Sequence, residues 1–180
     1  SPVAVAPVAA AQPAAAAQSA APAALGTGRA VFIRSITDER NFQVSPGDPA
    51  TPSVGWNGPL TDDVKARAIG RKRNTFGQAM GDVLLQPGQT VIGLMRENLT
   101  AAFQQAGYRL VSEAGESPAP VVVDAHIKQF WSWVQPGFWA LTFHGDITTD
   151  LEVVGASAPT NIKVQETDSR QMGTDGAFMG

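Results

Sequence analysis

The sequence predicts an α+β fold, in which a mainly antiparallel sheet of four or five strands packs on one long helix at residues 90–106. A disordered Ala/Pro-rich tether precedes this domain. Three observations lead to the prediction. One stretch repeats its apolar residues every three or four positions, stretches nearer the C-terminus alternate apolar and polar residues, and the first 26 residues contain thirteen alanines, four prolines and no charge.

Residues 1–26 lack the side chains needed to build a core. Proline inside a helix costs about 3 kcal/mol, and Pro2, Pro7, Pro13 and Pro22 interrupt any long helix in this segment. A semi-extended spacer is therefore predicted for residues 1–26. Residues 27–180 are predicted to form a single α+β domain.

The first part of the domain combines one clear strand with a long loop. Residues 30–36 are rich in β-branched and aromatic side chains and predict a strand. Residues 43–63 hold four prolines and three glycines, which is typical of a loop. Residues 64–86 remain open, with a short strand at 64–69 and an extended segment at 82–85 as candidates.

A helix follows over residues 90–106, where the apolar spacing marks one buried stripe. Gln89 or Thr90 can cap its N-terminus, because a side-chain oxygen there accepts a bond from a free backbone N–H. Gly107 stands where a left-handed glycine ends many helices.

Alternating strands at 121–134, 141–154 and 162–170 predict an antiparallel meander with one solvated face. On 121–134, strict alternation places Trp131 and Trp133 on the same buried face as Val121, Val123, Ala125 and Ile127. One helix is too small to bury the apolar face of such a sheet, so we expect a further helix beyond the C-terminus of this sequence.

Composition excludes several classes of function. A net charge of −3 gives no overall basic field for nucleic acid. The absence of cysteine excludes disulfides, thiolate nucleophiles and Cys-based metal sites. No stretch approaches the roughly 20 apolar residues that span a bilayer. We expect no cofactor and no enzymatic activity.

Two polar groupings could still bind a ligand. His126 and His144 lie on polar strand faces near aspartates, but they are not predicted to face each other, so solvated histidines are favoured over a metal site. Arg71, Lys72 and Arg73 could bind a lipid headgroup or phosphate, although a solvated loop is the simpler interpretation.

Aromatic residues are the strongest candidates for an interaction site. They gather at one end of the predicted hairpin, where some must pack in the core while others suit a protein interface or a membrane edge. The candidates are Phe130, Trp131, Trp133, Phe138 and Trp139.

Asp38 and Arg40 form a candidate structural pair. They share one face at the end of the first strand, where a bidentate arginine–carboxylate contact could fix the following loop.

Several segments together resemble YajG-type bacterial lipoproteins. These are the strand at 31–36 with Asp38-Glu39-Arg40, the helix Leu94-Met95-Arg96-Glu97-Asn98-Leu99 with its exit Gln105-Ala106-Gly107-Tyr108, and the later strand at 146–154. The resemblance implies an exported envelope lipoprotein, anchored in the outer membrane by a lipidated cysteine upstream of Ser1 and facing the periplasm. It implies no enzymatic activity.

The leading functional hypothesis is therefore a non-enzymatic binding or scaffold module, tethered in the cell envelope, whose partners are other envelope proteins or further copies of itself. A second hypothesis is a structural subunit of a larger envelope assembly that packs through the aromatic hairpin end. A third, less favoured, is a metal-dependent hydrolase that uses His126 and His144.

Overall fold

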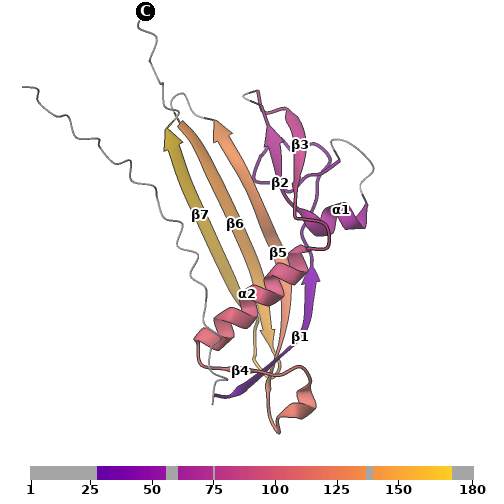
Figure 1. Ribbon diagram of the computed structural model, residues 1–180, viewed down its shortest axis with the longest axis vertical. Helices are drawn as coiled ribbons and strands as arrows, with labels where there is room; N and C mark the ends of the chain where they lie inside the picture. The colour runs from indigo at the N-terminus through magenta and orange to yellow at the C-terminus, as the bar shows by residue number, and fades with distance from the viewer. Residues whose placement is uncertain (1–27, 56–60, 75, 137–139, 172–180) are drawn as a thin grey trace, which may run out of the picture.

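In a computed structural model, the protein is described at residues 28–55, 61–74, 76–136 and 140–171. Seven strands in these residues form one sheet, with two α-helices and a 3₁₀ helix at Ala114–Glu116 (Figure 1). The predicted tether at 1–26 lies outside the described residues.

The predicted fold class is wrong, because the sheet is larger and mixed. Its strand order is β3-β2-β5-β1-β4, and β6 and β7 continue from the other edge of β5. Strand β1 (Ala30–Asp38) pairs in parallel with β4 (Arg109–Leu110) and with β5 (Val121–Pro136), and β2 (Ala68–Arg73) also pairs in parallel with β5. Parallel neighbours require crossover connections, which no local sequence pattern reveals.

The antiparallel part of the sheet follows the predicted meander. Strand β6 (Ala140–Val153) pairs with β5, and β7 (Thr160–Gln171) pairs with β6, both antiparallel. The segment that the sequence leaves open contains helix α1 (Asp62–Arg67) and a hairpin of β2 with β3 (Ala79–Leu84).

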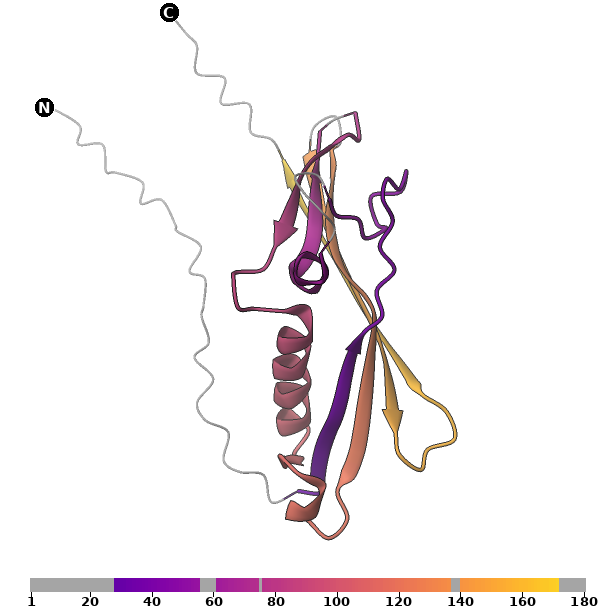
Figure 2. The ribbon, with the colours of Figure 1, turned by 90° about the vertical axis from the view of Figure 1, so that its right-hand side faces the viewer.

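Helix α2 (Val91–Gln105) lies where its periodicity predicts. The Thr90 side chain accepts a 3.1 Å bond from the Gly93 backbone N–H, and Gly107 has a φ of 87°. The helix is only 15 residues long and contacts mainly β1 and β4, so it covers one part of the sheet (Figure 2). The predicted single long helix covering the sheet is therefore not found.

A bulge in β5 divides the core in two. The pairing of β5 with β6 shifts between Ile127 and Gln129. Because one extra residue moves all later side chains to the opposite face, Trp131 and Trp133 lie on the other face from Ile127. The prediction of one shared face is wrong for this reason.

Each face of β5 therefore has its own core. Ile127 belongs to the main core beneath α2, with Val31, Val91 and Val123. Trp131 belongs to a second core with Val54, Ala68 and Phe42. Figure 2 shows the loop after β1 running along the face of the sheet opposite α2.

Glycine allows β2 to lie against β5. Gly70 is the residue of β2 that pairs with β5, opposite Ser132. A Cβ atom at position 70 would lie 2.7 Å from the Ser132 backbone oxygen, which is closer than real Cβ contacts. The Ser132 hydroxyl also donates a 2.8 Å bond to the Ile69 carbonyl.

Candidate functional site

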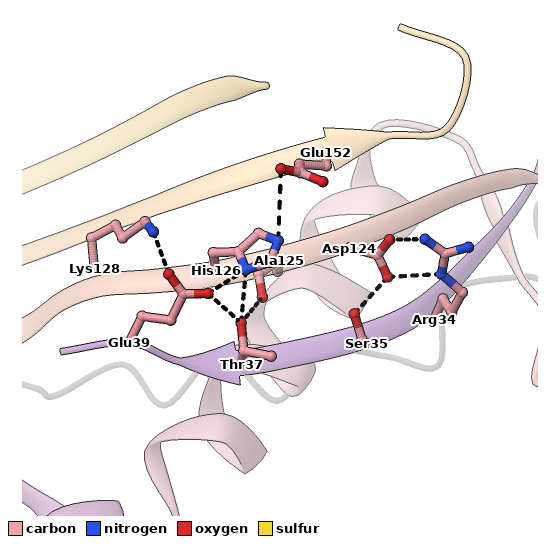
Figure 3. Close-up of polar contacts among 9 residues, drawn as sticks. All are labelled: Arg34, Ser35, Thr37, Glu39, Asp124, Ala125, His126, Lys128 and Glu152. Carbon is pink, nitrogen blue, oxygen red and sulfur yellow. Dashed lines mark hydrogen bonds and ion pairs between the residues drawn. The ribbon is translucent and has the colours of Figure 1, made fainter. Parts of the chain in front are cut away.

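A polar cluster lies over the C-terminal end of β1 and the middle of β5, on the face opposite α2 (Figure 3). Glu39 Oε1 lies 2.6 Å from His126 Nδ1, and Lys128 Nζ donates to the other Glu39 carboxylate oxygen. The Thr37 hydroxyl lies 2.8 Å from the same His126 nitrogen, and Glu152 is 3.9 Å from His126 Nε2.

A second group lies beside it on the same strands. Arg34 donates to both carboxylate oxygens of Asp124, and the Ser35 hydroxyl donates a 2.5 Å bond to Asp124 Oδ1. The hydrogen bond from Arg34 and then that from Ser35 lower the pKa of Asp124. Both groups join β1 and the residue that follows it to β5.

The geometry of the polar cluster does not fit nucleophilic catalysis. In a hydroxyl–imidazole–carboxylate triad, the hydroxyl and the carboxylate contact opposite ring nitrogens. Here Thr37 and Glu39 both contact His126 Nδ1. The carboxylate on the Nε2 side, that of Glu152, is 3.9 Å away, beyond hydrogen-bonding distance. Glu39 is also neutralised by Lys128, so the arrangement is that of a strand-to-strand contact.

Acid should weaken this contact. The hydrogen bonds from Lys128 and then from His126 lower the pKa of Glu39 from 4.5 to about 2. A depressed carboxyl pKa contributes stability above the unfolded pKa, and this is lost as the pH falls through the folded pKa. We expect the urea midpoint of the Glu39→Gln variant to change less than that of the wild type between about pH 5 and pH 2. If the urea midpoints of the two proteins fell in parallel over this pH range, the stabilising role assigned to Glu39 would be contradicted.

The contact expected between Asp38 and Arg40 is present. Arg40 donates to both oxygens of Asp38, at 2.8 and 2.7 Å. Its side chain is fully buried and also donates to the carbonyls of Lys65, Ala68 and Phe130. The guanidinium thus joins β1, β5 and the junction of α1 with β2, where the Lys65 carbonyl also accepts the Ala68 backbone N–H.

The three aromatic candidates that the structure describes do not form one surface. Trp131 is 2% exposed, meets the Phe42 ring edge-on at 6.2 Å and donates to the Pro49 carbonyl. Trp133 is half-buried and stacks on His144 at 5.0 Å, while Phe130 faces the side of α2. Phe138 and Trp139 lie outside the described residues.

The basic candidates are likewise dispersed. Arg71 is buried, 3.9 Å from Asp82. Lys72 is exposed, and half-buried Arg73 donates to the backbone carbonyls of Gly77 and Pro46. Because the residues alternate along β2, they present no joint cationic surface.

The histidines are placed apart, as expected. His126 pairs across the sheet with Asp150, and His144 with Trp133. Among the residues that the structure describes, no group of three His, Asp or Glu side chains could hold a metal ion. Neither described helix is long and apolar enough to cross a membrane.

The main feature missed by the sequence analysis is an uncovered apolar strip on the α2 side of β5, β6 and β7. Strand register places its four members beyond the part of the sheet that α2 contacts. The four members of this strip have side chains that are 37–55% exposed, and they are Val134, Phe143, Ile162 and Val164.

A hollow in the sheet adjoins this strip. Its floor holds Ser132 and Gly145, a cross-strand pair that lies between the larger pairs Phe130–Ile147 and Val134–Phe143. A Cβ atom at Gly145 would meet nothing within 4 Å. Ile69 from β2 closes one end of the hollow, so it joins segments that are far apart in the sequence.

Comparison with protein-family models, with curated proteins and with solved structures gives no match. The resemblance to YajG-type lipoproteins therefore stays a prediction.

Proposed function

We propose that this chain is a non-enzymatic binding or scaffold module of the bacterial cell envelope, which holds a partner against the uncovered strip and the adjoining hollow. In this proposal a lipidated residue upstream of Ser1 anchors the protein in the outer membrane, and residues 1–26 are the spacer that holds the domain in the periplasm.

The observation that supports binding is the exposure of apolar side chains next to a hollow. Phe143 is 41% exposed and Val164 is 55% exposed on the same face as the main core. Contiguous apolar groups on a soluble surface are typical of interaction sites. The hollow offers a recess for an apolar side chain of the partner, since Ser132 and Gly145 leave space between larger neighbours, and Glu166 of β7 adds a carboxylate to its lining.

The variant Gly145→Val tests this proposal without a large effect on the fold. A side chain at position 145 enters open space, and valine is well suited to a strand. A photo-cross-linking residue at Phe143 should give one discrete adduct in cells that produce the full-length protein. We expect Gly145→Val to abolish that adduct while leaving the urea midpoint unchanged.

Gly115→Val serves as the matched control, because a Cβ at Gly115 also meets nothing within 4 Å and lies away from the hollow. An adduct that persists in Gly145→Val would overturn the binding site. Fractionation of the same cells tests the location, and recovery in the cytoplasm would overturn the envelope assignment.

The assembly hypothesis makes a different prediction in the same experiment. An adduct with the mass of two chains would favour a structural subunit over a module that binds another protein. Of the aromatic residues first considered for such packing, Trp131 is unsuitable because it is buried.

A further inference from the structure

Strand β7 pairs on one edge only among the described residues, and its free edge is unusually regular. Its pairing with β6 runs from Thr160 to Gln171 without a register shift, and no proline interrupts it. Every side chain from Thr160 to Arg170 is exposed. An edge of this kind presents a row of free N–H and C=O groups that can pair with another strand.

The other two edges of the described sheet are protected. Strand β4 has only two residues, and β3 has six residues with two shifts in its pairing to β2. Short and bulged strands are common protections against edge-to-edge pairing. The long edge of β7 thus stands out from both.

We propose that β7 pairs antiparallel with β7 of a second copy, about a two-fold axis at Val164, so that the two sheets become continuous. This inference rests on the edge of β7; it shares Val164 with the strip described above but does not require a partner to bind there. Main-chain hydrogen bonds would supply affinity, and the side chains next to the axis would set the register.

Charge selects that register. Residues directly opposite each other in an antiparallel pair point to the same face of the sheet. A two-fold axis between two copies of β7 must therefore place one residue opposite its own copy. An axis at Lys163, Glu166 or Asp168 puts like charges opposite each other, and an axis at Thr167 opposes Glu166 to Asp168. Like charges directly opposite are destabilising.

Of the registers centred on residues 163–168, which pair at least seven residues of each β7, two remain. An axis at Gln165 places the apolar side chains of Val164 and Ile162 opposite the carboxylates of Glu166 and Asp168. An axis at Val164 opposes the two valines, puts Lys163 opposite Gln165 and leaves only Ile162 opposite a carboxylate, that of Glu166, with no like charges facing. Apolar cross-strand pairs are favourable, which selects Val164. The uncovered strip would then continue from one copy to the next through Val164, which is 55% exposed.

Sedimentation equilibrium of the 180-residue chain tests this pairing. The wild type should form a dimer that dissociates on dilution. Val164→Asp places two carboxylates across the axis and should raise the dissociation constant roughly tenfold or more. Val154→Asp is the control, since Val154 is 58% exposed and lies outside β7; it should dimerise like the wild type.

Mixing charge variants identifies the partner residue. Val164→Asp and Val164→Lys should each be mainly monomeric alone and form a dimer when mixed, because opposite charges then meet at the axis. Far-ultraviolet circular dichroism checks that both remain folded. A wild type that is monomeric at its highest soluble concentration would overturn the proposal, as would a mixture that stays monomeric or a Val154→Asp variant weakened equally.

Discussion

Replacing Arg40 by alanine is expected to destabilise the domain by about 3–5 kcal/mol, because it breaks a buried ion pair and removes the donor to several buried carbonyls. The Arg40 side chain is fully buried and donates to Asp38 and to the carbonyls of Lys65 and Ala68. The loss should appear as a lower urea midpoint for the variant than for the wild type.

A second arginine in the chain, Arg170, also contacts an aspartate two residues earlier, so it serves as a matched control for Arg40. Arg170 donates a 3.1 Å bond to Asp168, two residues earlier, but its side chain is 76% exposed. Exposed pairs contribute about 0–1 kcal/mol, so Arg170→Ala should change the unfolding free energy little. If Arg40→Ala and Arg170→Ala lowered the free energy of unfolding equally, burial would not be what decides the contribution of Arg40.

The second large effect is expected at Trp131. Replacing this tryptophan by alanine should cost about 3–5 kcal/mol, because its large side chain fills the second core beside Phe42. Urea unfolding followed by far-ultraviolet circular dichroism measures the change, since this signal does not depend on the removed indole.

Two further variants separate packing from hydrogen bonding at this position. Trp131→Phe keeps most of the ring but loses the 3.1 Å bond to the Pro49 carbonyl, so we expect a smaller loss of about 1 kcal/mol. Phe76→Ala removes an aromatic ring that is 87% exposed and should stay within about 0.5 kcal/mol of the wild type. A Trp131→Ala protein as stable as the wild type would instead return Trp131 to the candidate interaction residues.

The effects at Arg40 and Trp131 should be coupled. The Arg40 guanidinium lies 5.0 Å from the centre of the Phe42 ring, and Phe42 meets Trp131 edge-on. Side chains that share a packing partner seldom contribute additively. The three residues hold the loop after β1 against β5, so they support the side of the sheet opposite the proposed partner site.

The candidate site was only partly accessible to sequence reasoning. The alternation on 141–154 indicates that Phe143 faces the apolar side of a sheet. Its exposure depends on how far α2 reaches, and sequence spacing carries no information about that. The hollow also depends on β2, because Ile69 reaches it from a hairpin that the sequence left open.

The sequence by itself determined the local elements. Helix α2 and its limits follow from the 3.6-residue period, the Thr90 side chain and the left-handed Gly107, all of which act within a few residues. The meander of β5, β6 and β7 likewise follows from alternation and short connections.

Only the tertiary structure decided which faces are covered and which strands become neighbours. The parallel pairing of β1 with β5 joins segments about ninety residues apart, and a one-residue bulge after Ile127 moves Trp131 to the opposite face. Both depend on packing between distant segments, since the energy gained from burial there exceeds local preferences. Arg71 is buried for the same reason.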